Sequence, residues 1–251
     1  MDTIDLKNKV AIVTGASGGI GSEIARTLSS SGSIVAACYH QNEQGALATI
    51  AQCKQEAIAM QGDISNPSSC EEIIKAVVKR FDRIDILVNN AAIGPRDSFE
   101  MMYGEWQTHW KATLNANLMS AVNMTYCSVP HMRKQGGGKI INIASRSAFR
   151  AETEYMAYAV SKAAMVNFTK CTARVLAKDN ILTYAVAPGF IEAGMGLEDI
   201  AKHGKEIRAQ IPSGKIGSSH DVANVVLFLA SDLSNYLTGS TIDVNGGSYL
   251  R

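Results

Sequence analysis

The sequence predicts a single α/β domain of the doubly wound type, with helices on both faces of a parallel sheet of about seven strands. Short, continuously apolar runs alternate with helical patterns along the whole chain. A glycine-rich turn follows the first apolar run, and neither a low-complexity linker nor an internal repeat divides the chain. Continuously apolar strands separated by helices are typical of a parallel sheet buried on both faces. We therefore expect residues 1–251, of which 46% are hydrophobic, to form one domain.

The predicted strands are short apolar runs, at 9–14, 33–39, 56–60, 85–88, 139–143, 181–186 and 241–244. The predicted helices are 19–31, 44–54, 67–81, 104–133, 154–178 and 221–230. Asn66 is a good cap for the third helix, and Pro67 suits its first position because no helical hydrogen bond is lost there. In open α/β sheets ligands bind beyond the carboxyl ends of the strands, so the loops after the strands are the candidate functional segments.

Composition and charge exclude several classes of function. Lys and Arg total 24 against 23 Asp and Glu, and the formal net charge of +1 provides no field for gripping nucleic acid. The longest uncharged run, 112–132, contains three asparagines and a proline, too many polar groups for a membrane-spanning helix. The acidic N-terminus lacks the basic and apolar parts of a signal peptide, so we expect a cytoplasmic protein.

The cysteines and histidines indicate no metal site. The five cysteines are dispersed without a C-x-x-C pair, and the five histidines lack the spacing of metal ligands. Such a set in a cytoplasmic chain predicts reduced thiols that are mostly buried.

The turn after the first strand predicts a dinucleotide site. Gly15, Gly19 and Gly21 allow a tight turn and a close approach of phosphate to the backbone. The amides that open the following helix then face the diphosphate along the positive end of the helix dipole. No Lys followed by Ser or Thr comes after the glycines, which excludes a nucleoside-triphosphate loop.

This G-x-x-x-G-x-G spacing resembles that of the short-chain dehydrogenase/reductase family, and the resemblance extends from about residue 7 to 248. Four further motifs follow later strands: Asp63-Ile64, Asn89-Asn90-Ala91-Ala92, Pro188-Gly189 and Gly246-Gly247. Ala92 stands where the family has glycine. The resemblance implies a Rossmann-type fold and a set of cofactor-binding residues: Gly15, Ser17, Gly19, Ile20, Gly21, Tyr39, His40, Asp63, Ile64, Asn90, Ala91, Tyr158, Lys162, Pro188, Gly189 and Ile191.

The end of the second strand favours NADP(H) over NAD(H). NAD selection normally uses an acid at this position, and the sequence has Tyr39 and His40 instead. A 2′-phosphate would meet no repulsion there, and His40 could donate a hydrogen bond to it. The basic residue that many NADP-using relatives carry in the turn is replaced by Gly18, which leaves NAD(H) open.

Tyr158 and Lys162 form a candidate proton-transfer pair. An i, i+4 pair shares one face of a helix, so the phenol and the ammonium can approach a common space. A free tyrosine has a pKa of about 10, and a cation at about 4 Å would lower it by up to roughly three units. By resemblance, Ser145 is the residue that bonds the substrate oxygen, and Asn117 is the fourth catalytic residue, whose carbonyl holds a water bound to Lys162.

Other residues near this pair are candidates for substrate contact. Tyr155 lacks a lysine partner four residues on and is expected to line the substrate pocket, together with Ser145, Ser147 and Phe190. Arg146 and Arg150 either face the pocket or are solvated loop residues.

The overall pattern most resembles the 3-oxoacyl-[acyl-carrier-protein] reductases, which implies a carbonyl or secondary alcohol substrate. Tyr184 and Ala193 depart from that pattern, where those reductases have Asn and usually Thr. The alternatives are a sugar or small-ketone dehydrogenase and, more distantly, a non-catalytic dinucleotide sensor, since fold does not settle function. The glycine-containing segment 190–212 suggests a substrate lid.

Family resemblance also implies a homotetramer, assembled through the long helices and the last strand. The apolar segments 222–229 and 249–250 are compatible with burial between subunits.

Overall fold

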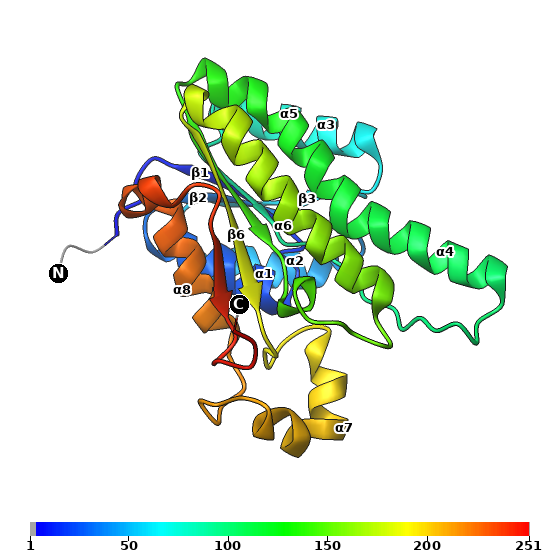
Figure 1. Ribbon diagram of the computed structural model, residues 1–251. Helices are drawn as coiled ribbons and strands as arrows, with labels where there is room; N and C mark the ends of the chain where they lie inside the picture. The colour runs from blue at the N-terminus through cyan, green and yellow to red at the C-terminus, as the bar shows by residue number, and fades with distance from the viewer. Residues whose placement is uncertain (1–3, 251) are drawn as a thin grey trace.

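The computed structural model describes residues 4–250, which form a seven-stranded parallel sheet between two layers of helices (Figure 1). The strand order is β3-β2-β1-β4-β5-β6-β7, so the direction of winding reverses between β1 and β4. The strands are β1 (Val10–Thr14), β2 (Ile34–Tyr39), β3 (Ala57–Gln61), β4 (Ile86–Asn89), β5 (Gly138–Ile143), β6 (Ile181–Pro188) and β7 (Thr241–Val244). The predicted doubly wound fold is confirmed.

The eight α-helices of this part of the chain connect or follow the strands: α1 (Gly19–Ser30), α2 (Glu43–Ala51), α3 (Pro67–Phe81), α4 (Tyr103–Leu114), α5 (Ser120–Lys134), α6 (Met156–Leu176), α7 (Gly196–Ala209) and α8 (Ser219–Ala230). Asn66 caps α3 as predicted, since its Oδ1 accepts a hydrogen bond of 3.0 Å from the Ser68 amide. Pro67 occupies the first position of that helix.

Alternate residues of each central strand enter opposite halves of the core. Ala11 and Val13 of β1 belong to the cluster that α1 and α8 cover, whereas Val10 and Ile12 belong to the cluster that α3 and α5 cover. Successive side chains of a strand point to opposite faces, so a continuously apolar strand must be buried on both.

The long predicted helix over 104–133 is interrupted. Between α4 and α5 the residues Asn115–Met119 form a π-helical turn, which inserts extra backbone without ending the helix. Asn117, within this turn, accepts a hydrogen bond of 2.7 Å from the Ile93 amide and donates one of 2.8 Å to the Ile93 carbonyl. These two bonds tie the turn to the loop after β4, a contact that helical periodicity does not reveal.

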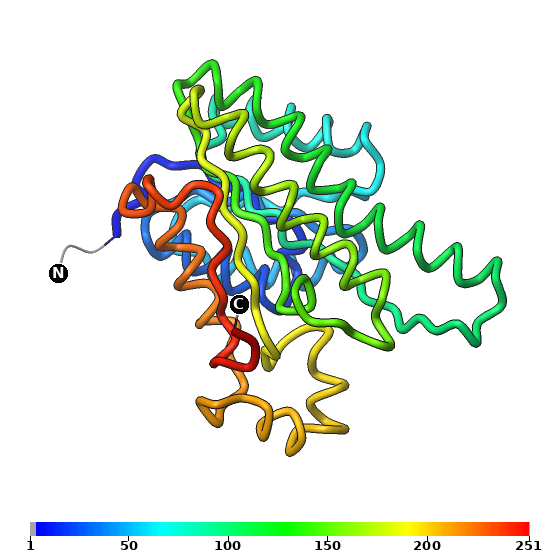
Figure 2. Tube along the Cα trace, viewed as in Figure 1, coloured from blue at the N-terminus to red at the C-terminus, as the bar shows by residue number. Residues whose placement is uncertain are grey.

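The segment after β6 is more regular than predicted. It contains α7, which is bent at His203 and lies beyond the carboxyl ends of the strands (Figures 1 and 2). Figure 2 shows how the chain leaves the sheet for this segment and returns through α8.

Tyr184 and the apolar residues of α8 are both part of the core. Tyr184, the first departure from the reductase pattern, is a core residue whose hydroxyl donates to the Ser234 carbonyl at 3.1 Å. The apolar positions Val222, Val226 and Leu229 pack inside this chain, because they form the α8 side of the core. They are therefore not free for a subunit interface.

Among the described residues, no helix combines the length and apolar character needed to cross a bilayer.

Candidate active site

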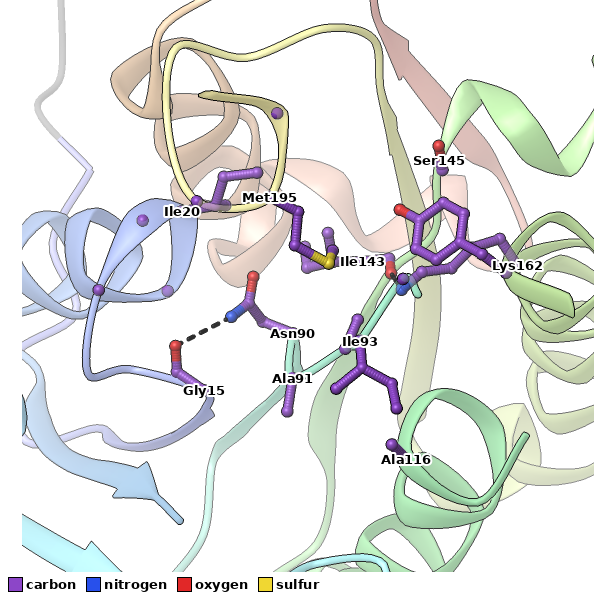
Figure 3. A pocket seen from close by; sticks show the side chains of 18 of the residues that line it. Gly15, Ile20, Asn90, Ala91, Ile93, Ala116, Ile143, Ser145, Lys162 and Met195 are labelled. Atoms are coloured by element: carbon purple, nitrogen blue, oxygen red, sulfur yellow. Dashed lines mark hydrogen bonds between the residues drawn. The ribbon is translucent and has the colours of Figure 1, made fainter. Parts of the chain in front are cut away.

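A cavity of about 1290 Å³ opens along the carboxyl ends of the strands, from the glycine turn to the start of α6 (Figure 3). It contains every predicted site residue except Asn117: Gly15, Ser17, Gly19, Ile20, Gly21, Tyr39, His40, Asp63, Ile64, Asn90, Ala91, Ser145, Ser147, Tyr155, Tyr158, Lys162, Pro188, Gly189, Phe190 and Ile191. Parallel strands end at one edge, so loops that are far apart in the sequence meet there.

The glycine turn leaves no room for side chains. Gly15 and Gly19 have φ angles of +65° and +54°, a conformation that favours glycine. A Cβ on Gly21 would lie 2.2 Å from the Gly15 carbonyl oxygen. Asn90 fixes the turn from β4, because its side-chain amide donates to the carbonyls of Thr14 and Gly15 at 2.9 and 3.3 Å (Figure 3).

The start of α1 fits the diphosphate of a dinucleotide. Its first turn contains no acidic residue, and no side chain caps it. A Cβ on Gly18 would meet no atom within 4 Å, so the space above the turn is open. Free amides, the positive end of the helix dipole and this open space together form an anion cradle.

The end of β2 presents side chains other than carboxylates to the cavity. Tyr39 and His40 line it, as do the next two residues, whereas Glu43 at the start of α2 does not. The pKa of Tyr39 is raised, mostly by burial. The negative charge of Glu43 and a hydrogen bond with it raise this pKa further. Asp63, after β3, lines the cavity and has a lowered pKa, chiefly because the Ser65 hydroxyl bonds it at 2.7 Å.

Ser145 and Lys162 lie at the other end of the cavity (Figure 3), and Tyr158 lines it there as well. Ser145 follows β5, and its Oγ accepts a hydrogen bond of 3.1 Å from the Ser147 amide. Lys162 is 2% exposed, and its ammonium donates to the Ile143 carbonyl at 2.8 Å and lies 5.5 Å from the centre of the Tyr158 ring.

The pKa values of this pair differ from the expectation in the cofactor-free protein. Burial raises the pKa of Tyr158, a hydrogen bond with Ser145 opposes that shift, and the Glu152 charge adds to it. Burial also lowers the pKa of Lys162 to about 8. The expected lowering of the Tyr158 pKa by Lys162 is not found, because burial is the largest cause of the Tyr158 shift and the Lys162 ammonium is directed to the Ile143 carbonyl.

Asn117 is buried beside the cavity and does not line it. Besides the two bonds to Ile93, its side-chain amide donates to the Ser161 hydroxyl at 3.0 Å. Ser161 in turn donates to the Tyr158 carbonyl at 2.6 Å. The side chain of Asn117 thus joins the loop after β4 to the turn of α6 that carries Tyr158.

Asp97 is a positioning residue that the sequence analysis missed. Its buried carboxylate accepts hydrogen bonds of 2.8 Å from the amides of Met156 and Ala157, the first two residues of α6. A carboxylate at a helix start is favoured by the free amides and by the helix dipole. Asp97 therefore fixes the end of the helix on which Tyr158 lies.

A second missed group ties α7 to the cavity wall. Arg96, after β4, pairs with Asp199 of α7 at 2.7 Å and with Glu154. The Tyr155 hydroxyl also donates to Asp199, at 3.1 Å, and the Arg96 guanidinium lies 5.2 Å from the centre of the Tyr155 ring. No sequence motif connects these residues, since they come from three segments that are far apart in the chain.

The two arginines that follow Ser145, Arg146 and Arg150, lie in different surroundings. Arg146 is 5% exposed and lines the cavity, so the solvated alternative is wrong for it. Arg150 instead bonds Gln210 at 3.1 Å in an exposed position. Within residues 4–250, no group of three or more metal-ligating side chains comes together.

The fold and this cavity point to a class of protein, the dinucleotide-dependent oxidoreductases, because the glycine turn, two hydroxyl groups and a buried lysine line one cavity. Comparison with known proteins supports the same class. The model of a family described as enoyl-(acyl carrier protein) reductase matches residues 15–249. A 3-oxoacyl-[acyl-carrier-protein] reductase FabG of Aquifex aeolicus is 40% identical over 252 residues and covers 98% of this chain and 99% of its own. The Staphylococcus epidermidis reductase of that name is 39% identical over 248 residues, with coverage of 97% and 100%.

Solved structures agree. A Sinorhizobium meliloti 1021 protein, provisionally named a short-chain alcohol dehydrogenase, matches with a TM-score of 0.91, 29% identity and 97% coverage of both chains. The chain belongs to the short-chain dehydrogenase/reductase family. It is thus an oxidoreductase that acts between a carbonyl and an alcohol with a nicotinamide dinucleotide.

Proposed function

We propose that this protein reduces 3-oxoacyl thioesters, carried by an acyl-carrier protein, with NADPH. The observation that supports the proposal most is the meeting of Ser145, Tyr158 and Lys162 in one cavity with the glycine turn. Hydroxyl groups at this point suit the protonation of a carbonyl oxygen, which favours 3-oxoacyl over enoyl reduction. The names of the curated relatives supply the acyl-carrier substrate.

Each residue of the cluster has a proposed role. Ser145 donates a hydrogen bond to the substrate carbonyl oxygen, and Tyr158 gives its phenolic proton to the same oxygen. Lys162 would hold the ribose, and its charge would stabilise the phenolate that remains. When bound, the nicotinamide dinucleotide supplies the hydride. The backbone carbonyl of Asn117 would hold a water that returns a proton towards Lys162.

The cofactor residues fit a dinucleotide with a 2′-phosphate. The amides of Ser17, Ile20 and their neighbours at the start of α1 would bind the diphosphate. Asp63 and Ile64 would contact the adenine, and Asn90, Ala91, Pro188, Gly189 and Ile191 the inner half of the cofactor. His40 would donate to the 2′-phosphate at the end of β2, which supports NADP(H) over NAD(H).

The segment 190–212 is proposed to act as a lid. A Cβ on Gly19 would lie 3.4 Å from the Cα of Gly194, so the segment already touches the glycine turn. Met195 points into the cavity (Figure 3) and lies near Gly94. Asp199 accepts a hydrogen bond from Tyr155 on the opposite wall. Since these contacts cross the cavity, this segment must shift to admit a dinucleotide and a substrate. Ser147, Tyr155 and Phe190 would then line the substrate half.

A second candidate is a sugar or small-ketone dehydrogenase. It is favoured by the provisional names of two structural relatives, the Sinorhizobium meliloti protein above and an Agrobacterium tumefaciens protein provisionally named a gluconate dehydrogenase, with 26% identity and a TM-score of 0.92. The cytoplasm is the proposed location, and a homotetramer is the proposed assembly.

A substrate panel tests the proposal. The purified protein is given NADPH or NADH and an acetoacetyl thioester, a set of sugars, or simple ketones, and kcat/KM is measured for each pair. We expect the thioester with NADPH to give the highest value. A higher value for a sugar or a simple ketone would replace the proposed substrate class, and a preference for NADH would replace the cofactor.

A further inference from the structure

Arg146 is a buried arginine that lines the cavity beside Ser145 and has an unused donor in its guanidinium. It directly follows Ser145 and opens a short 3₁₀ turn, Arg146–Ala148. Although its side chain is about 6% exposed, it lines the cavity. Its Nη1 atom is buried and has no hydrogen-bond partner among residues 4–250. The role proposed for Ser145 and Tyr158 makes no use of this group.

The neighbours of Arg146 in the described part of the chain fix the position of its side chain but give its Nη1 donor no hydrogen-bond acceptor. The guanidinium lies over the Phe190 ring, 4.3 Å from the ring centre. Its Nη2 atom is 4.0 Å from Oε1 of Glu152, too far for a hydrogen bond, and that oxygen already accepts one of 3.1 Å from Ser147. Glu152 therefore balances the charge of Arg146 but leaves Nη1 free.

An unpaired guanidinium N–H in a buried position is costly. Burial lowers the pKa of Arg146, with the Glu152 charge opposing that shift, yet an arginine keeps its proton in proteins. A buried donor without an acceptor destabilises the folded protein, and a ligand that supplies the acceptor removes this cost when it binds. Because Ser145 and Arg146 line the same cavity, one substrate can present its reacting carbonyl to Ser145 and a second acceptor to Arg146.

We propose that Nη1 of Arg146 donates a hydrogen bond to a second, acyl carbonyl oxygen of the substrate, close to the ketone that is reduced. This inference rests on the proposed function and refines it: the site selects ketones that also carry an ester, thioester or carboxyl group. Since Glu152 offsets the charge of Arg146, a neutral ester or thioester suits the subsite better than a free carboxylate.

The first test removes the donor. Arg146→Met keeps a long apolar side chain against Phe190, and Arg150→Met is the matched control, because Arg150 bonds Gln210 in an exposed position. The substrates are an acetoacetyl thioester, methyl acetoacetate and 2-heptanone, a ketone of similar size without an acyl group. Arg146→Met should lower kcat/KM for the two acyl substrates by about 10- to 100-fold and leave 2-heptanone within about twofold. Arg150→Met should change neither.

The second test changes the charge balance and does not require the first variant to fold. Glu152→Gln leaves the charge of Arg146 without its counterion. The kcat/KM for acetoacetate should therefore rise relative to that for methyl acetoacetate. We expect the ratio of their kcat/KM values to rise at least about threefold. Glu152 also raises the pKa of Tyr158, but that effect applies to both substrates and cancels in the ratio. Calorimetric binding of both compounds to the complex with oxidised cofactor gives the same ratio without turnover.

The outcomes separate the inference from the proposed function. An equal loss for acyl substrates and 2-heptanone in Arg146→Met, or an unchanged acid-to-ester ratio in Glu152→Gln, would overturn the role of Arg146 and leave the proposed function standing. If the wild-type protein prefers a sugar or 2-heptanone to every acyl substrate and binds acetoacetate and its ester no better than 2-heptanone, both proposals fail.

Discussion

At the residue scale, Lys162 holds a positive charge where water scarcely reaches it. Burial lowers its pKa from 10.5 to about 8, so between these pH values the unfolded chain binds a proton that the folded chain does not. Stability from this group therefore rises with pH over that range, and the cost of the charge is greatest below pH 8. A lysine this costly in the cofactor-free protein is consistent with one kept for the bound state.

Replacing Lys162 by methionine should stabilise the cofactor-free protein. At pH 7 we expect the free energy of unfolding to rise by up to about 3 kcal/mol, the equivalent of the pKa shift. The gain should shrink as the pH approaches 10.5, where wild-type Lys162 is neutral in both states. Denaturant unfolding of both proteins at several pH values measures the difference, in which the shared cysteines and tyrosines cancel. A gain that does not depend on pH would show that packing, not charge, is responsible.

Sequence reasoning at this scale identified the residues that form motifs and missed those that act across the fold. Ser145, Tyr158 and Lys162 have fixed spacings, and all three line the cavity. Asp97 belongs to no motif and was missed, and the sequence left open whether Arg146 faces the pocket, because both depend on which helix end or ring lies opposite the side chain. The pKa of Tyr158 could not be foreseen either, because the direction in which the Lys162 ammonium points is a property of the fold.

At the scale of elements, the glycine turn and α1 act as one unit. Gly21→Ala would place a Cβ 2.2 Å from the Gly15 carbonyl oxygen and 2.5 Å from the Asn90 amide. Since neither backbone nor Asn90 can withdraw without opening the turn, we expect the affinity for NADPH to fall at least about tenfold and the melting temperature to drop by several degrees.

Gly18→Ala is the matched control for folding. Its φ of 171° is extended backbone, and its Cβ would meet no atom within 4 Å. The melting temperature of the cofactor-free protein should therefore stay within about 2 °C of wild type. Fluorescence titration and thermal melting measure both variants. Equal effects of the two changes would contradict the packing account of the turn.

The elements themselves were largely predictable. All seven strands were found, with ends displaced by a residue or so, because buried parallel strands are continuously apolar. The π-helical turn at Asn115–Met119 was not, since it depends on the bonds between Asn117 and the loop after β4. The length of the helix α7 was underestimated, because glycines in its sequence are typical of a loop and because the helix is bent at His203.

At the scale of the whole molecule, the long helices present apolar side chains to solvent. Tyr126 of α5 is 79% exposed and Val175 of α6 is 60% exposed. We expect a homotetramer that covers part of this surface, with a mass of about four times 26.8 kDa in light scattering. Val175→Asp should reduce the mass without changing the circular dichroism spectrum. A wild-type mass of a single chain would contradict this assembly.

The central claim is that Tyr158 delivers the proton in a reaction between a carbonyl and a bound dinucleotide. Its most direct test compares Tyr158→Phe with wild type, in kcat for the best substrate and in affinity for NADPH. We predict that kcat falls roughly 10²- to 10⁴-fold while the dissociation constant for NADPH stays within about twofold, since phenylalanine removes only the hydroxyl. A variant that retains kcat within about threefold of wild type would contradict the claim.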